Sequence, residues 1–306
     1  MTHPNWMPMA PRRSSQKSPL GCLRWLIPAR FRTDMPLVPV VRLSGVIGAA
    51  VPLRPGLTLA GVARTLERAF AVRHASAVAI LINSPGGSPT QSHLIFRRIR
   101  ALAEDKKIPV FTFIEDVGAS GGYMLACAGD EIIADTFSIA GSIGVVGGGF
   151  GFPQLMKKLG IERRVYTAGE RKVMLDPFLP EKPDDVKRLK AIQKDIHAHF
   201  VALVKDRRGG KLKGADKTLF SGEFWTASNA LELGLIDTIG DLRSVLRERY
   251  GDKVRTPLIS SERRLFGFKL PGATALGRLG AIAQDGLTAE AISALETRAL
   301  WSRYGL

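Results

Sequence analysis

The sequence predicts an α/β protein with a mostly parallel sheet built from βαβ units. Short apolar runs such as "AVAILI" (77–82) and "VFTFI" (110–114) are typical of parallel strands buried on both faces. Segments with an apolar residue every three or four positions lie between these runs, as expected for crossover helices. The chain has 306 residues, 45% of them hydrophobic, which is enough for a substantial core.

The predicted elements follow one another in a regular order. Strands are expected at 37–48, 77–82, 110–114, 131–135 and 142–147. Helical spacing is found at 57–74, from Leu94 onward, after Ser120 to about residue 128, and after Pro183. The last unit, 220–240, is expected to form a turn, a helix that ends at Gly234, and a short strand.

Composition divides the chain into three parts, 1–35, 36–250 and 251–306. The formal net charge is +16, and residues 1–35 carry six basic side chains against the single acid Asp34. This first part is expected to be a basic arm that is disordered or lies on an anionic membrane surface, whereas nucleic acid is not an expected partner. The role of 251–306 is not predicted.

No run of the sequence approaches the roughly 20 apolar residues of a membrane-spanning helix. Cys22 and Cys127 are the two cysteines, and they indicate neither a disulfide framework nor a zinc site. The glycine-rich "VVGGGFGF" (145–152) lacks the spacing of a phosphate-binding loop. The sequence therefore predicts no metal and no cofactor.

The segment from Gly118 to Gly122 matches the G-x-S-x-G pattern of a serine on a sharp turn between a strand and a helix. An α/β-hydrolase would need a histidine on a loop later in the chain. The histidines after Ser120 are His197 and His199, and both fall inside the predicted long helix. An α/β-hydrolase with Ser120 and a histidine stays an alternative, but its base is missing.

A serine can also be activated by a neutral lysine. An exposed lysine, with a pKa of about 10.4, is protonated, so the base needs partly apolar surroundings that lower its pKa. Lys172 is one candidate, because it follows a strand-like "RRVYT" and a turn at Gly169 and precedes three apolar residues. Position alone does not separate Lys172 from Lys157 and Lys158.

A second glycine-rich turn, 83–87, follows the buried strand at 77–82. Loops at the carboxyl ends of parallel strands line the binding crevice of an open sheet, and the Ser120 turn occupies such an end too. The N–H groups of Gly86, Gly87 and Gly121 are therefore candidates for an oxyanion hole. The alternative is a tight turn without a chemical role.

Four segments resemble the signature blocks of signal peptide peptidase A and its SohB-like relatives in peptidase family S49. These segments, in the order of the family, are "INSPGGSPTQSHLIFRRIRAL", "GASGGYMLACAGDEIIADTFSIAGSIGVV", "YTAGERKVMLDPF" and "ALELGLIDTIGDL". The resemblance covers about residues 37–246 and implies a Clp protease/crotonase-like fold with a Ser/Lys dyad. It assigns Ser120 as the nucleophile, Lys172 as the general base and Gly86 and Gly87 as oxyanion glycines.

The resemblance implies a serine endopeptidase that cleaves short apolar or unfolded peptides, such as remnants of signal peptides. It also implies a homo-oligomeric ring, because one copy of a short family member supplies only part of the cleft. The membrane anchor common in the family has no clear counterpart, so the expected location is the bacterial cytoplasmic membrane or the cytoplasm. Three alternatives remain: the α/β-hydrolase with Ser120 and a histidine, a crotonase-like acyl-CoA enzyme, and a binding protein that uses residues 1–35.

Overall fold

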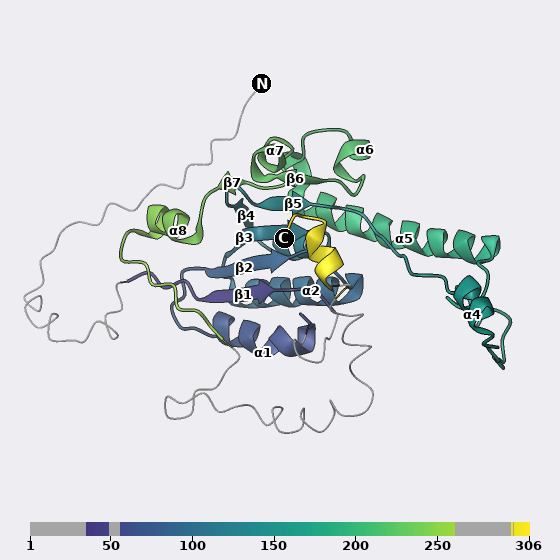
Figure 1. Cartoon of the computed structure of the whole chain (residues 1–306). Helices are drawn as coiled ribbons and strands as arrows, with labels where there is room; N and C mark the ends of the chain where they lie inside the picture. Colours follow the sequence, from purple (N-terminus) through teal and green to yellow (C-terminus); the bar gives the residue numbers. More distant parts are fainter. Residues whose placement is uncertain (1–34, 49–55, 261–294, 296) are drawn as a thin grey trace, which may run out of the picture. The chain divides into compact units, whose positions relative to one another are not determined.

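The computed structural model of the chain describes residues 35–48, 56–260, 295 and 297–306. The predicted basic arm, 1–35, lies outside these residues except for Met35. The core is one sheet in the order β1-β2-β3-β4-β7, with every neighbouring pair parallel (Figure 1). The predicted α/β class with βαβ units is therefore confirmed.

The strands are β1 (Val40–Ser44), β2 (Val78–Ser84), β3 (Val110–Ala119), β4 (Glu131–Ala134), β5 (Ile139–Gly141), β6 (Phe224–Thr226) and β7 (Thr238–Ile239). The helices are α1 (Leu59–Phe70), α2 (Pro89–Lys106), α3 (Gly121–Ala126), α4 (Pro153–Leu159), α5 (Pro183–Arg208), the 3-10 turn η3 (Gly209–Lys211), α6 (Asp216–Leu219), α7 (Ala227–Glu232) and α8 (Leu242–Tyr250).

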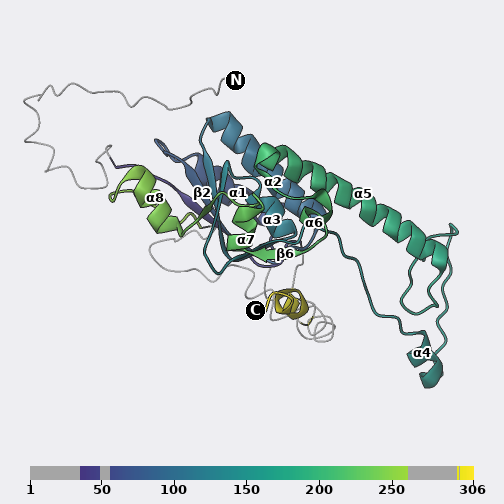
Figure 2. The same ribbon diagram turned by 90° about the horizontal axis from the view of Figure 1, so that it is seen from above.

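The two faces of the sheet are covered by different helices. The larger core joins one face of the central strands to α1, α2, α3 and the C-terminal part of α5, and it contains Ile80, Ile95, Tyr123 and Phe200. The opposite face packs against α8 through Leu246 and its neighbours. Figure 2 shows α8 apart from the group formed by α2, α3 and α5. Burial on both faces explains the uninterrupted apolar runs of β2 and β3.

Strand β3 changes its partner halfway along its length. It pairs with β4 as far as Ile114 and with β5 from Val117 onward, and its register to β2 shifts in the same region. The buried hydroxyl of Ser138 donates to the carbonyl oxygens of Ile114 (3.0 Å) and Glu115 in this bulge. The bulge brings β5 beside the end of β3, just before Ser120.

The prediction of a strand at 142–147 is wrong. The strand of this region is β5, which ends at Gly141, and Ser142 has a φ of 52° that turns the chain away. Residues 143–149 pair with no strand among the described residues, so their short apolar run does not become a strand. The strand-like stretch 163–167 is also irregular in the structure.

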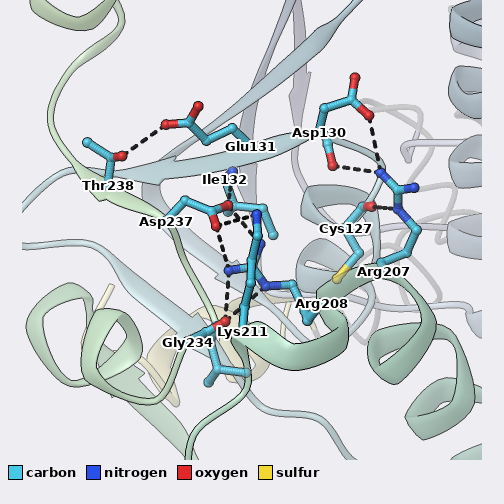
Figure 3. Close-up of polar contacts among 12 residues, drawn as sticks. Cys127, Asp130, Glu131, Ile132, Arg207, Arg208, Lys211, Gly234, Asp237 and Thr238 are labelled. Atoms are coloured by element: carbon cyan, nitrogen blue, oxygen red, sulfur yellow. Dashed lines mark hydrogen bonds and ion pairs between the residues drawn. The ribbon is translucent and has the colours of Figure 1, made fainter. Parts of the chain in front are cut away.

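Helix α5 is fixed to the core at its C-terminal end by two arginines (Figure 3). Arg208 is buried and donates to both carboxylate oxygens of Asp237 (2.7 and 3.0 Å) and to the carbonyl oxygen of Gly234. Arg207 donates to the carbonyl oxygens of Cys127 (2.8 Å) and Gly129 (2.9 Å), directly after α3. The end of α5 is thus attached to the helix that begins after Ser120.

Burial would raise the pKa of Asp237, but hydrogen bonds from Arg208 and Lys211 and from the Ile132 N–H outweigh it and hold the pKa below its usual value. Burial raises the pKa of the nearby Cys127 thiol to about 12, so this cysteine stays protonated.

Among the described residues, no helix is long and apolar enough to cross a membrane.

Replacing Arg208 by Met is expected to reduce the free energy of unfolding by about 2–4 kcal/mol, because it removes two hydrogen bonds to the partly buried carboxylate of Asp237 and leaves that carboxylate only the Lys211 and Ile132 donors. Urea denaturation measures the loss. The matched control is Lys211→Ala, which removes a half-exposed partner of the same carboxylate and should cost less than about 1 kcal/mol. Equal losses of unfolding free energy in the two variants would contradict the assignment of Arg208 as the main partner of Asp237.

The contribution of Asp237 should depend on pH. Because its pKa is lower in the folded protein than in the unfolded chain, its stabilisation is present above the unfolded value of about 3.9 and disappears as the pH falls through the folded value. The difference in unfolding free energy between the wild type and Asp237→Asn should therefore be constant from pH 5 to 7 and shrink below about pH 4. If the difference in unfolding free energy instead grew as the pH fell, the pKa of Asp237 would not be lowered in the folded protein.

Candidate active site

Ser120 lies on a strained turn between β3 and α3. Its φ of 52° and ψ of −121° are unusual for a residue with a side chain, a geometry that costs on the order of 1–3 kcal/mol and is concentrated at functional sites. The Ser120 N–H donates to the carbonyl oxygen of Gly141 in β5 (2.8 Å), and its own carbonyl accepts from the Met124 N–H (3.0 Å). The side chain is partly exposed, as a nucleophile requires.

The loop after β2 lies directly against this turn. A Cβ atom on Gly86 would be 2.8 Å from the Cβ of Ser120 and 3.0 Å from the N of Gly121, so only glycine fits here. Both loop glycines have a positive φ, 105° for Gly86 and 138° for Gly87. The structure thus brings together four of the five predicted site residues: Ser120, Gly86, Gly87 and Gly121.

The three glycine N–H groups differ in their hydrogen bonds. The Gly86 N–H donates to the Ser84 hydroxyl (3.2 Å), whereas the Gly87 N–H finds no acceptor among the described residues. The Gly121 N–H belongs to the first turn of α3, where N–H groups have no partner within the helix. Gly87 and Gly121 therefore remain the candidates for the two donors of an oxyanion hole.

Lys172 is not part of this cluster. It lies in a segment that leaves the core after Ile143 and returns with α5, which we call the arm (residues 144–182). None of the residues of the arm is buried, and the Lys172 side chain contacts no hydrogen-bond or ion-pair partner in the described part of the chain. Figures 1 and 2 both show α4, the helix of the arm, away from the sheet.

Contacts between its own residues stabilise the arm. The rings of Phe152 and Phe178 are 5.6 Å apart, the Arg163 guanidinium lies over Phe178, and it also pairs with Asp176 (2.8 Å). Most of the exposed large apolar side chains of the described residues nevertheless lie in the arm: Val146, Phe150, Phe152, Leu155, Leu159, Ile161, Val165, Tyr166, Phe178 and Leu179. Exposed apolar surface of this kind marks an interaction site.

The two histidines after Ser120 lie on α5, as the sequence predicts. The Nε2 of His197 is hydrogen-bonded to the carbonyl oxygen of Ile143 (3.1 Å), and His199 is exposed beside Asp195. Neither contacts Ser120. No three potential metal ligands among His, Cys, Asp and Glu gather in the described ranges.

Sequence reasoning missed the groups that hold the serine turn from the β5 side. The indole of Trp225 in β6 packs against Gly141, where a Cβ atom would lie 2.5 Å from the ring, and the Gly141 carbonyl accepts the Ser120 N–H. The signal was present as Gly141-Ser142 in "SIAGSIGVV", but a glycine in an apolar run does not reveal which chain approaches it.

Residues 102–253 match the model of peptidase family S49. A Brucella abortus protein named Na(+)/H(+) antiporter NhaA is 57% identical over 303 residues, which are 96% of this chain and 40% of that protein. The Arabidopsis thaliana serine protease SPPA, chloroplastic, is 32% identical over 230 residues, which are 72% of this chain and 33% of that protein. The chain thus spans less than half the length of these two curated relatives.

A mutant of a membrane-bound stomatin-specific protease in complex with a substrate peptide aligns with a TM-score of 0.45 and 16% identity, covering 76% of this chain and 94% of that chain.

The parallel sheet places the chain in the α/β class, with a strained serine on the turn between β3 and α3. The family match then identifies the family within this class: the chain belongs to peptidase family S49. The family expected from the signature blocks, that of the SppA/SohB-like proteases, is confirmed.

Replacing Gly86 by Ala is expected to reduce reaction of Ser120 with a fluorophosphonate probe at least 100-fold, because the new methyl group overlaps the Ser120 Cβ. Labelling of the purified protein measures the effect. The control is Gly160→Ala, which also has a positive φ but no atom within 4 Å of the new methyl group. Equal labelling of Gly86→Ala and wild type would contradict the site geometry.

Proposed function

We propose that the protein is a serine endopeptidase that cleaves short apolar or unfolded peptides, with remnants of signal peptides as the expected class of substrate. The observation that carries the proposal is the contact between Gly86 and Ser120 in a chain of family S49. A strained, partly exposed serine next to two backbone N–H groups that find no acceptor among the described residues supports it.

The reaction begins when the Ser120 hydroxyl oxygen attacks the carbonyl carbon of the scissile peptide and the Lys172 amine takes the hydroxyl proton. The negative charge that develops on the carbonyl oxygen accepts hydrogen bonds from the Gly87 and Gly121 N–H groups. The C–N bond then breaks, and the Lys172 ammonium returns the proton to the leaving amine. Water, deprotonated by Lys172, hydrolyses the acyl-enzyme in the same way.

This mechanism requires Lys172 to reach Ser120, and the geometry of one chain does not bring them together. The proposal therefore assigns the two residues of each dyad to neighbouring copies. A copy that covers the apolar side chains of the arm would also enclose Lys172, and burial favours the neutral amine that a general base needs. The exposed apolar surface of the arm supports this assembly.

An arm that extends to a different surface on the next copy makes a head-to-tail contact, which closes into a ring when the rotation between copies permits it. The uncovered stripe of α5 supports the same assembly. Ile192 is 40% exposed, although it continues the apolar face on which Phe200 is buried. A homo-oligomeric ring is thus part of the proposal, and its number of subunits is not assigned.

The proposed location is the bacterial cytoplasmic membrane or the cytoplasm, with the basic residues 1–35 as the candidate contact to anionic lipid. The charge of this segment supports the membrane contact, since each basic residue near an anionic surface contributes about 1 kcal/mol. Salt extraction of the protein from a membrane fraction tests this contact.

Ser120→Ala and Lys172→Ala are each expected to lower turnover of an apolar fluorogenic peptide by at least about 1,000-fold without unfolding the protein. A 1:1 mixture of the two variants, unfolded and refolded together, should regain roughly a quarter of the activity, because random head-to-tail neighbours combine an intact Ser120 with an intact Lys172 at that frequency.

The control mixes each variant with itself and should stay inactive. A mixture without activity, from variants that assemble, would exclude a dyad shared between copies. Full turnover in Lys172→Ala would exclude this lysine as the base, and failure of the wild type to react with a fluorophosphonate would favour the crotonase-like alternative.

A further inference from the structure

We propose that Ser84 is a positioning residue that fixes the spacing between the Gly87 and Gly121 N–H groups around Ser120. This inference rests on the proposed function, because it assigns a role in the oxyanion site of that reaction. Ser84 is the last residue of β2 and is completely buried, so its hydroxyl does not reach the substrate. It acts on the reaction only through the residues that it contacts.

Both hydrogen-bonding capacities of the Ser84 hydroxyl are used within the protein. The hydroxyl donates to the carbonyl oxygen of Gly45 (2.7 Å) and accepts from the N–H of Gly86 (3.2 Å). Gly45 follows β1, and Gly86 belongs to the loop that touches Ser120. The hydroxyl therefore connects the chain after β1 with the chain after β2.

The same loop is held at its far end by Ile47. The Ile47 N–H donates to the Gly86 carbonyl (2.8 Å), and the Ser88 N–H donates to the Ile47 carbonyl (2.8 Å). With Ser84 and Ile47 as partners on its two sides, the loop keeps one orientation. In the part of the chain that the structure describes, these bonds leave the Gly87 N–H without an acceptor.

Ser84 also contacts the segment that provides the second donor. A Cβ atom on Gly122, directly after Gly121, would lie 2.4 Å from the Ser84 carbonyl oxygen and 3.2 Å from its Cβ. A single buried residue thus touches the oxyanion loop on one side and the first turn of α3 on the other. The helix α3 has only six residues and the loop is rich in glycine, so neither segment fixes its own position. The contacts of Ser84 with both segments therefore decide how far apart the Gly87 and Gly121 N–H groups lie.

Alanine would fill nearly the same space but leave the Gly86 N–H and the Gly45 carbonyl without partners. The peptide unit that carries the Gly86 N–H would then move to find a new acceptor, and only the bond from the Ile47 N–H to the Gly86 carbonyl would hold the next unit, which carries the Gly87 N–H. The Gly87 N–H is therefore expected to lose its fixed position. An oxyanion hole works at donor distances of about 2.7–3.1 Å from the developing charge. A displaced donor weakens binding of the transition state and leaves ground-state binding of the peptide unchanged.

The test measures the steady-state cleavage of an apolar fluorogenic peptide by the full-length protein. Ser84→Ala should lower kcat about 10- to 100-fold and change KM by less than about 3-fold. The inhibition constant of a peptide aldehyde, which forms a tetrahedral oxyanion on the serine, should rise by the same factor as kcat falls. A purely structural role would lower the folded fraction and leave this inhibition constant unchanged.

Thr112→Val is the matched control. Thr112 is also buried, and its hydroxyl donates only to backbone carbonyls, those of Ala126 (2.9 Å) and Glu131 (3.2 Å), but it contacts neither donor segment. Thr112→Val should leave kcat, KM and aldehyde inhibition within about 2-fold of the wild type, even if its stability falls. Equal effects of Thr112→Val and Ser84→Ala on kcat would overturn the inference.

Wild-type kcat in Ser84→Ala would also overturn it, as would unchanged aldehyde inhibition. If Ser84→Ala does not fold, Ser84→Cys decides, because a thiol of similar shape is a weak donor and acceptor. An intermediate kcat supports the inference, and wild-type kcat refutes it. Retained turnover in Ser120→Ala would instead refute the proposed function itself, so the two failures are distinguishable.

Discussion

The change of partner by β3 is the constraint on which the candidate site depends. A regular strand would keep β4 as its neighbour to the end, and no carbonyl of β5 would be available to the residue after Ala119. The bulge, held by the Ser138 hydroxyl, brings Gly141 next to Ser120 instead. The serine turn is then held between β5 on one side and the loop after β2 on the other. Its strained backbone persists because both neighbours fix it.

Much of this architecture could be predicted from the sequence, since β2 and β3 are continuous apolar runs and the glycines mark the turns after them. The partner of each glycine could not be predicted, because contacts of Gly86 with Ser120 and of Gly141 with Trp225 join residues far apart in the chain. The stretch 142–147 was predicted as a strand because of its short apolar run. A strand also needs a neighbour to pair with, and composition does not supply one.

The role of Lys172 shows a different limit of sequence reasoning. Its assignment rests on resemblance, and the structure of one chain leaves it on the exposed arm, where no described contact supports or excludes its role. The long helix shows the same effect. Its apolar stripe correctly predicts a helix with one covered face, but the cover inside the chain extends only over the part that includes Phe200 and Val204. Periodicity reveals that a face needs a cover and does not reveal which molecule provides it.

The segment 255–259 runs parallel to β1 through hydrogen bonds between Val38 and Arg255, Val40 and Pro257, and Ile259 and Val40. It covers the N–H and C=O groups that would otherwise lie open along this edge of the sheet. Residues 255, 257 and 259 direct their backbone groups toward β1, so the new outer edge is formed by the residues between them. The N–H groups of Val38 and Val40 are thus used within the chain, and a second copy cannot add a strand to the sheet at these two residues.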